Sequence, residues 1–192
     1  MEDKGYFIHP TAVMDPGAQV GIGTKIWHFS HLMPSSQVGK HCVIGQNVYV
    51  DSNVIIGNGV KIQNNVSIYN GVEVEDDVFL GPSMVFTNVI NPRSFIERKN
   101  EFQKTIIRKG ASIGANATII CGIEIGRYAM IGAGAIVLQT IPPYALVVGN
   151  PGHQVGWVSE AGHTLNFDIM GFATCPQSGD KYRLTNNILQ KL

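Results

Sequence analysis

Residues 44–62 read IGQNVYVDSNVIIGNGVKI, with an aliphatic residue at every sixth position. The same spacing extends outward from this stretch, from Ile8 to Phe86 without a slip, and resumes in a new phase from Ile107 to Val137. A period of six fits neither the 3.6-residue turn of an α-helix nor the simple alternation of a strand. It is typical of a β-solenoid, in which each repeat is one short strand followed by a corner.

Within each hexad the residue types separate an interior from a set of corners. The first position is large and apolar and the fifth is small, as in Ala18, Thr24 and Ser36, so both are expected to face the core. Glycine, asparagine and aspartate are frequent at the corners, as in residues 57–59, where they tolerate tight or left-handed backbone. Three strands close the smallest prism, so a coil takes eighteen residues and the twenty hexads predict between six and seven coils. The expected fold class is all-β.

Composition sets the broad class of the protein. A chain of 192 residues is large enough for one domain with a real core. The formal net charge is zero, which argues against a broad electrostatic attraction to nucleic acid. There is no run of eighteen apolar residues and no basic-apolar leader, so neither a membrane span nor a signal peptide is expected. Three widely spaced cysteines without a CxxC pattern favour a reducing cytoplasm.

The repeat divides the chain into a regular region and a tail. Residues 1–148 are expected to form the β-helix domain, beginning with a polar lead-in over 1–7, and residues 149–192 lose the hexad. A non-repeating tail is one way to cover the unpaired strand edges at an open solenoid end. In this capping tail we expect short strands and turns over 166–184 and a brief helix over 186–192.

One segment interrupts the repeat. Phe86 and Ile107 are 21 residues apart, so three residues fall outside the six-residue phase. We therefore expect residues 88–106 to leave the prism as an inserted loop, and loops on rigid scaffolds tend to carry function.

Recurrent Ile-Gly steps mark the hexads, a run of small residues spans 132–135, and the repeat region ends in the sequence VGNP at 148–151. Over about 140 residues these features resemble the hexapeptide-repeat acyltransferases. The resemblance implies a left-handed parallel β-helix that works as a homotrimer.

More particular motifs lie around the loop and in the tail: FTNVINPRS at 86–94, GANATI at 114–119, GWVS at 156–159 and CPQSG at 175–179. They resemble bacterial N-acetyltransferases of UDP-linked amino sugars, nearest to the group that acetylates the 3-amino position of UDP-2-acetamido-3-amino-2,3-dideoxyglucuronate for surface polysaccharide such as O-antigen. The resemblance implies acetyl-CoA as donor and active sites shared between neighbouring subunits. Neither spacing nor composition shows the sugar, so another amino sugar or a hydroxyl acceptor stays an alternative.

Acetyl transfer to an amine requires positioning of both substrates, a donor to the thioester oxygen and a destination for the departing proton. Residues 88–106 contain no histidine, and His28 and His31 are expected on a corner and an outer surface, so no histidine is a convincing base. The departing thiolate of coenzyme A, with an ordinary thiol pKa of ~8.5, can itself take the proton. Asn88 is the candidate catalytic residue, because it lies where the solenoid opens into the loop and its amide can donate and accept. A turn-forming asparagine is the alternative.

The acceptor is expected near Asn88. Asn70 lies eighteen residues earlier, so it should stack one coil away, with Tyr69 beside it. Arg93 and Arg98 in the loop suit bidentate binding of carboxylate or phosphate, and a diphosphate-linked uronic acid offers both. A structural corner and a solvated charged loop are the alternatives for these residues.

Acetyl-CoA is expected along the second run of hexads. There, small side chains outside the core leave the backbone open to a pantetheine arm, and an arginine can meet a phosphate. The Asn-Pro pair matches the terminal signature of the family, near the adenine end. The corresponding residues are Ala115, Arg127, Ala133, Gly134, Asn150 and Pro151. Simple corner packing is the alternative for the alanines.

Two other function classes use the same architecture. A carbonic anhydrase of this fold needs three histidines converging on zinc, with two of them five residues apart. Here His28 and His31 are three apart and no third is obviously placed, so no metal is expected. A non-catalytic solenoid, either an ice-binding or an assembly protein, should show a ladder of threonines on one face, which this sequence lacks.

Overall fold

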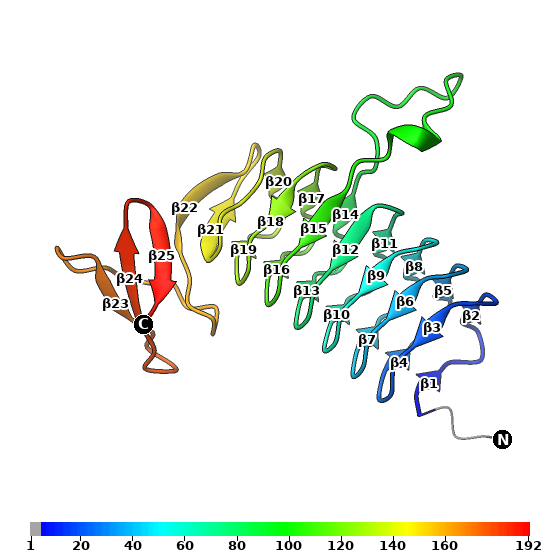
Figure 1. Ribbon diagram of the computed structural model, residues 1–192, viewed down its shortest axis with the longest axis horizontal. Coiled ribbons are helices and arrows are strands. Elements are labelled where there is room, and N and C mark those ends of the chain that lie inside the picture. Colours follow the sequence, from blue (N-terminus) through cyan, green and yellow to red (C-terminus); the bar gives the residue numbers. More distant parts are fainter. Residues whose placement is uncertain (1–4) are drawn as a thin grey trace.

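The computed structural model describes residues 5–192, and its main feature is a three-faced prism of short parallel strands (Figure 1). Strands in successive coils pair at a spacing of eighteen residues, as Ile8 does with Ile26 and Ile26 with Ile44. The expected all-β architecture, a left-handed parallel β-helix of hexapeptide repeats, describes this fold.

The three sheets follow one another around each coil, and we call them faces A, B and C. Face A contains β1 (Phe7–Ile8), β4 (Lys25–Ile26), β7 (Val43–Ile44), β10 (Lys61–Ile62), β13 (Phe79–Leu80), β16 (Ser112–Ile113), β19 (Met130–Ile131), β21 (Ala145–Val148) and the antiparallel β22 (His153–Trp157). Face B contains β2 (Val13–Met14), β5 (His31–Leu32), β8 (Tyr49–Val50), β11 (Ser67–Ile68), β14 (Val85–Phe86), β17 (Thr118–Ile119) and β20 (Ile136–Val137). Face C contains β3 (Gln19–Val20), β6 (Gln37–Val38), β9 (Ile55–Ile56), β12 (Val72–Val74), β15 (Thr105–Ile107) and β18 (Glu124–Ile125).

The hexad places its large aliphatic residue inside the prism. Ile62 is fully buried while Lys61, the preceding residue of β10, is exposed. Burying each such side chain contributes about 1.5–3 kcal/mol, so the stacked interior adds to the backbone hydrogen bonds that join successive coils. The small fifth residues are buried as predicted, and the Thr24 hydroxyl donates to the carbonyl of Gly39 at 2.8 Å, which satisfies a buried polar group.

The corners adopt the backbone that their residues suggested. Asn47 and Asn65 have φ of 58° and 62°, in the left-handed region that asparagine tolerates better than most residues. Glycine serves a second purpose where coils approach closely, because a Cβ on Gly39 would collide with the backbone of Gly57 in the next coil. The sequence pattern therefore encodes both the turn and the stacking distance.

The prism is longer than the hexads predicted. The three faces hold eight, seven and six parallel strands, one more in total than the twenty hexads predicted. The additional strand is β21, which was missed because Val147 pairs with Ile131 only sixteen residues earlier. A shorter connection therefore continues the parallel pairing after the six-residue phase has ended.

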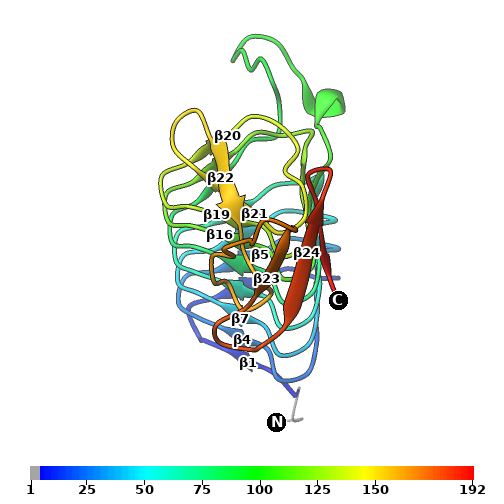
Figure 2. The ribbon, with the colours of Figure 1, turned by 90° about the vertical axis from the view of Figure 1, so that its left-hand side faces the viewer.

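The loop leaves the prism at Asn88 as predicted but returns earlier than the expected 106, because Thr105 and Ile106 already belong to β15 and pair with Val72 and Glu73. Val74 pairs with Ile107, 33 positions later, so one coil carries fifteen residues more than its eighteen-residue neighbours. The backbone N–H of Gln103 donates to the carbonyl of Asn88 at 3.0 Å, closing the base of the loop. Figures 1 and 2 show the segment between these residues, with the short 3-10 helix η1 (Lys99–Glu101), projecting well beyond the prism.

The tail forms a small antiparallel sheet of β23 (Phe172–Thr174), β24 (Lys181–Thr185) and β25 (Ile188–Lys191). The short strands expected over 166–184 are present, but the helix expected over 186–192 is wrong. Asn186 and Asn187 both have positive φ, which makes a two-residue hairpin turn, and Thr185 pairs with Ile188 across it. Figure 2 shows this sheet lying across the C-terminal end of the prism.

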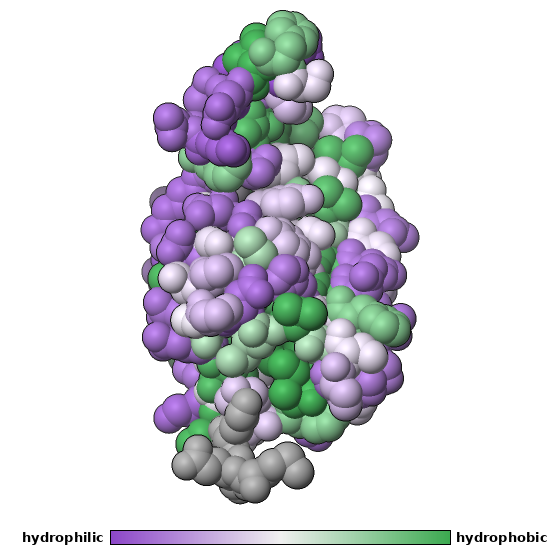
Figure 3. Space-filling view, turned by 90° about the vertical axis from the view of Figure 1, so that its right-hand side faces the viewer, coloured by the Kyte–Doolittle hydropathy of each residue, from purple (hydrophilic) through white to green (hydrophobic). Residues whose placement is uncertain are grey.

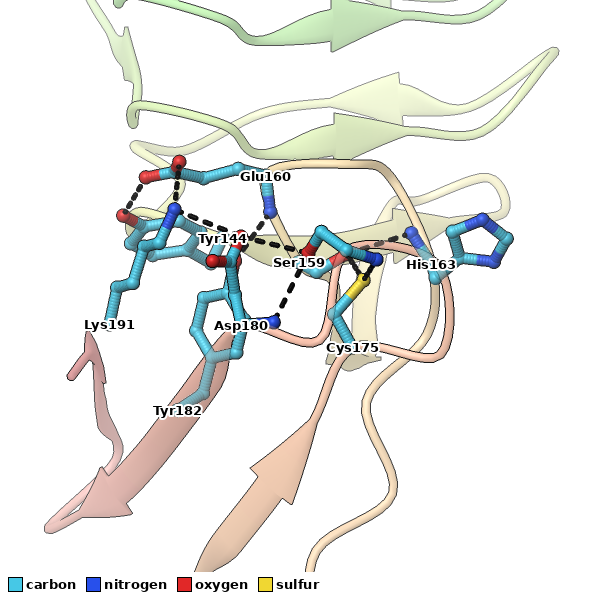
Figure 4. A network of polar contacts seen from close by, with 9 residues as sticks. Tyr144, Ser159, Glu160, His163, Cys175, Asp180, Tyr182 and Lys191 are labelled. Atoms are coloured by element: carbon cyan, nitrogen blue, oxygen red, sulfur yellow. Dashed lines mark hydrogen bonds and ion pairs between the residues drawn. The ribbon is translucent and has the colours of Figure 1, made fainter.

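A polar network joins the tail to the last coil (Figure 4). The Tyr144 hydroxyl donates to Glu160 at 3.2 Å, and Lys191 from β25 contacts the other oxygen of the same carboxylate at 2.8 Å. Burial raises the pKa of Tyr144 to about 12, so its hydroxyl stays protonated as a donor. Cys175 and Tyr182 are buried in the same apolar cluster as the prism core, so the tail covers the end of that core.

The two ends of the prism differ. At the N-terminal end, Phe7, Val13 and Ile22 are 44%, 50% and 62% exposed, and Figure 3 shows apolar side chains gathered on this end. Of the polar lead-in expected over 1–7, residues 1–4 lie outside the described residues, and Phe7 already belongs to β1. Within residues 5–192, no helix is long and apolar enough to cross a membrane.

Candidate active site

The structure separates the predicted site residues by the corner on which they lie. Asn70 and Asn88 follow strands of face B, at the corner between faces B and C. Ala115 and Ala133 follow strands of face A, at the corner between faces A and B. Face B thus runs between the predicted acceptor residues and most of the predicted acetyl-CoA residues.

Asn88 lies at the base of the loop. Its side chain is half-buried and makes no hydrogen bond within the described residues, while its carbonyl accepts from Gln103. The pairing of Ser67 with Val85 puts Asn70 at the same position of the preceding coil, as the eighteen-residue spacing predicted. The Asn88 amide can therefore both donate to and accept from a ligand or water, and its catalytic role stays a prediction.

Asn70 is held more firmly. Its side-chain Nδ2 donates to the carbonyl of Ser52 at 3.0 Å and its backbone N–H donates to Asp51 at 3.2 Å. Tyr69 beside it is half-buried against the core, with its ring centroid 6.4 Å from that of Tyr49. These two residues therefore shape the surface next to Asn88, with the Asn70 amide already committed to the coil below.

The loop forms an open pocket of about 230 Å³, which is lined by Asn88, Val89, Pro92, Arg93, Ile96, Glu97, Arg98, Lys99 and Phe102. Arg93 is exposed and donates to the carbonyl of Pro92 at 3.1 Å. Arg98 pairs with Glu101 at 2.7 Å, while its Nε is buried with no partner. A buried guanidinium N–H without an acceptor is costly.

The corner between faces A and B carries a stack of small residues. The N–H of Gly134 donates to the carbonyl of Ala115 at 2.8 Å, which brings neighbouring coils together there. Ala133 and Gly134 are exposed, and no atom lies within 4 Å of the position a Cβ on Gly134 would take. The backbone at this corner is therefore open, as the prediction of a pantetheine site there requires. Asn150, joined to Pro151 by a cis peptide bond, lies exposed at the turn after β21.

Arg127 is not part of this stack. It follows β18 at the corner between faces C and A, and its guanidinium lies over the ring of Tyr144 at 5.6 Å from the centroid. A cation–π contact occupies one face of the guanidinium, while the residue stays exposed, so phosphate binding by Arg127 stays a prediction. The sequence could not show this because Tyr144 reaches it through the shortened connection before β21.

A larger cavity, of about 340 Å³, lies on face C beside Ile55 and Lys109. Its acidic lining is already paired, because Glu73 contacts Lys104 at 2.8 Å and Glu75 contacts Arg108 at 2.8 Å. No predicted site residue lines it, and its size alone does not make it the centre of the chemistry.

Sequence reasoning missed a group on face B. His31 Nε2 lies 3.0 Å from Asp15 Oδ2, and the Tyr49 hydroxyl donates to Asp51 at 3.1 Å. These residues stand two to four coils from Asn88, and the only sequence signal for them was their outward hexad positions. Within residues 5–192, no three His, Cys, Asp or Glu side chains gather in a way that could hold a metal ion.

Known proteins with hexapeptide repeats match this chain in sequence. The family model for bacterial transferase hexapeptides (six repeats) matches residues 17–52 and 104–139, and that for the hexapeptide repeat of succinyl-transferase matches residues 37–70. A dTDP-3-amino-3,6-dideoxy-alpha-D-galactopyranose 3-N-acetyltransferase from Aneurinibacillus thermoaerophilus is 42% identical over 186 residues, covering 97% of this chain and 95% of that protein. The chain belongs to the hexapeptide-repeat acyltransferases. It is therefore an enzyme that transfers an acyl group.

Solved structures show that the acyltransferase shares its fold with more distant proteins. A variant of GDP-perosamine N-acetyl transferase from Caulobacter crescentus, in complex with CoA and GDP-perosamine, has a TM-score of 0.56 at 20% identity, over 79% of this chain and 56% of that chain. The acetyltransferase domain of PglB from Neisseria gonorrhoeae, in complex with acetyl coenzyme A, has a TM-score of 0.53 at 20% identity, over 79% of this chain and 58% of that chain. At these identities the likeness concerns the fold alone.

Proposed function

We propose that this acyltransferase transfers the acetyl group of acetyl-CoA to the amino group of a nucleotide-linked amino sugar. The observation that carries the proposal is the 42% identity, over 97% of the chain, to a protein named as a dTDP-amino-sugar 3-N-acetyltransferase. The geometry supports it, because an unpartnered amide at Asn88 and an open small-residue corner flank the same face of the prism.

For the acceptor we propose a UDP-linked 3-amino uronic acid, made for surface polysaccharide. The support is the motif resemblance together with the loop pocket, which is lined by Arg98 and by the exposed Arg93. A carboxylate on the sugar would compete with Glu101 for the Arg98 guanidinium and form charge-assisted hydrogen bonds in its place.

In the proposed reaction the neutral amine attacks the thioester carbonyl, a C–N bond forms and the C–S bond breaks. The Asn88 amide donates to the carbonyl oxygen as it gains charge. The amine proton passes to the departing coenzyme A sulfur, whose ordinary pKa of ~8.5 suits it to accept a proton near neutral pH. Positioning of two large substrates supplies much of the remaining acceleration.

The proposed working form is a cytoplasmic homotrimer. The loop extends away from its own prism, and in a trimer it would reach the face of a neighbouring subunit (Figure 1). Ala115, Ala133, Gly134, Asn150 and Pro151 would then hold acetyl-CoA beside an acceptor bound at Asn88.

The test is direct. The purified protein is incubated with acetyl-CoA and a panel of UDP- and dTDP-linked amino sugars, and thiol release is followed. We expect turnover with a 3-amino acceptor and none with the corresponding 3-hydroxy sugar. Thiol release that does not depend on any amino sugar would overturn the proposal.

A second candidate acceptor is a neutral 3-amino-3,6-dideoxy sugar, which the name of the similar Aneurinibacillus protein favours. The two candidates differ by the carboxylate. If Arg98→Ala lowers kcat/KM for the uronate at least tenfold more than for the 6-deoxy sugar, the carboxylate lies at the loop pocket. Equal losses for both sugars would favour the neutral acceptor.

A further inference from the structure

Five side chains on and beside face B form a continuous series of contacts that leads toward the loop. We call Asp15, His31, Tyr49, Asp51 and Tyr69 the face B string. Figure 1 shows the strands that carry or precede them, β2, β5, β8 and β11, following one another along the prism toward β14 and the loop. Only Tyr69 was expected at the site from sequence.

The contacts of the string are specific. His31 Nε2 lies 3.0 Å from Asp15 Oδ2, and the His31 ring meets the Tyr49 ring edge-on with centroids 6.0 Å apart. The Tyr49 hydroxyl donates to Asp51 Oδ1 at 3.1 Å, and the Tyr49 and Tyr69 ring centroids are 6.4 Å apart. Asp51 Oδ2 in turn accepts from the backbone of the residue after Tyr69, which stands one coil before Asn88. Each side chain is thus held in place by its neighbour.

The position of the string relates it to the other substrate. Ala115, Ala133 and Asn150, the expected acetyl-CoA residues, lie on coils that follow the loop, whereas the string lies on coils that precede it. If the acceptor amine is at Asn88, the rest of the acceptor therefore extends toward the N-terminal coils. From Asn88 to His31 is three coils, or roughly 14 Å at the ~4.8 Å spacing of strands. That is comparable to the reach of an extended nucleoside diphosphate from its sugar.

We propose that the face B string binds the nucleotide part of the acceptor, with the base against Tyr49 and His31. This inference rests on the proposed function and adds which surface recognises the nucleotide.

The chemistry of the string suits such a ligand. Tyr49 and Tyr69 offer partly exposed rings on which a planar base can stack. The His31 side chain is 39% exposed, and its Nδ1 makes no hydrogen bond within residues 5–192, so it can bond the polar edge of a base. Burial and the neighbouring Asp51 raise the pKa of Tyr49, so its hydroxyl keeps its proton and its bond to Asp51. The diphosphate would then lie between the base and the cationic loop.

Asp51 and Asp15 do not oppose this placement. Asp51 accepts from Tyr49 and from the backbone N–H groups of Ser52 and Asn70, at 2.7 Å and 3.2 Å for the latter two. Asp15 faces His31. Both carboxylates are therefore committed within the string, where they orient the two rings before a ligand arrives, and such preorganisation favours binding.

The experiment measures binding of UDP and of CoA separately, by titration calorimetry, to Tyr49→Ala, Tyr49→Phe and His31→Gln. We expect Tyr49→Ala to raise the Kd of UDP at least tenfold, and His31→Gln at least threefold, with the Kd of CoA within twofold of the parent. Tyr49→Phe keeps the ring and should stay within threefold for UDP. The matched control is Ile55→Ala, an outward residue of β9 on face C that is 46% exposed, which should change neither Kd.

Two outcomes would overturn the assignment of the nucleotide to the face B string. A UDP Kd within twofold of the parent in both Tyr49→Ala and His31→Gln, in folded protein, overturns the inference. A fall in oligomeric mass by light scattering would instead assign the string to a subunit contact and overturn it as well. Because UDP alone is the probe, the result does not depend on transferase activity. Weakened UDP binding without turnover on any amino sugar would retain this site and reject the proposed function.

Discussion

Replacing Asn88 by alanine separates a catalytic role from a structural one. The Asn88 side chain is half-buried and makes no hydrogen bond within residues 5–192, while the bond that closes the loop uses its backbone carbonyl. Alanine keeps that carbonyl, so the free energy of unfolding should change by less than about 0.5 kcal/mol. Loss of a donor to the developing oxyanion should lower kcat roughly 10²-fold, or about 2.7 kcal/mol in the barrier.

Asn70→Ala provides the contrast. That side chain donates to the carbonyl of Ser52 at 3.0 Å, so its removal leaves a backbone acceptor without its partner and should cost about 1 kcal/mol of stability. The same substitution can also lower activity, because Asn70 stands one coil before Asn88, next to the proposed acceptor site. Asn70→Ala should therefore lower the melting temperature measurably, whereas Asn88→Ala should not.

The assay is the rate of thiol release at saturating acetyl-CoA and acceptor, from pH 6 to 9, with thermal unfolding followed on the same samples. Gln37→Ala, an exposed outward position of face C, serves as the control and should match the parent in both measurements. Activity of Asn88→Ala within threefold of the parent would refute the assigned role. If Asn88→Ala lowers the melting temperature as well as the rate of thiol release, Asn88 is a turn residue.

Three further predictions concern the loop, the histidines and the tail. Replacing residues 92–102 by Gly-Gly keeps the hydrogen bond between Gln103 and Asn88 at the base of the loop. The melting temperature should therefore stay near that of the parent, while turnover is abolished. Retained turnover would place the chemistry elsewhere. His9 has its pKa lowered by desolvation and by the adjacent His28, whose ring centroid is 3.5 Å away, so the unfolded chain binds more protons just below pH 6.5. Stability should therefore fall as the pH drops through 6.5, less steeply in His9→Gln, as shown by melting curves at pH 7.5 and 5.5; parallel curves would contradict this. We propose that residues 159–192 cap the prism. Their removal should lower the melting temperature and cause concentration-dependent association, measured by light scattering. An unchanged monodisperse species would show that the cap is dispensable.

The repeat itself could be predicted from sequence because its cause is local. Each hexad specifies an inward aliphatic residue, a small residue before the next strand and a corner that tolerates left-handed backbone. Ile62 is an example of the inward residue, and Asn65, three positions later, is an example of the left-handed corner. The loop could also be predicted from sequence, because an insertion breaks the six-residue phase between Phe86 and Ile107. These features depend on neighbours along the chain, so no knowledge of tertiary contacts was needed.

Other features were decided only when the chain was folded. The extra strand β21 and the packing of Arg127 against Tyr144 depend on a connection whose length departs from the hexad. The hairpin at Asn186 and Asn187 replaced a short helix because pairing of β25 with β24 satisfies more backbone groups than an isolated turn of helix could. Apart from the local bond between Tyr49 and Asp51, the contacts of the face B string join residues that are sixteen to twenty apart in sequence but adjacent on successive coils. A six-residue pattern states which way each side chain points, whereas the partner it meets across a coil is set by the stacking of the whole prism.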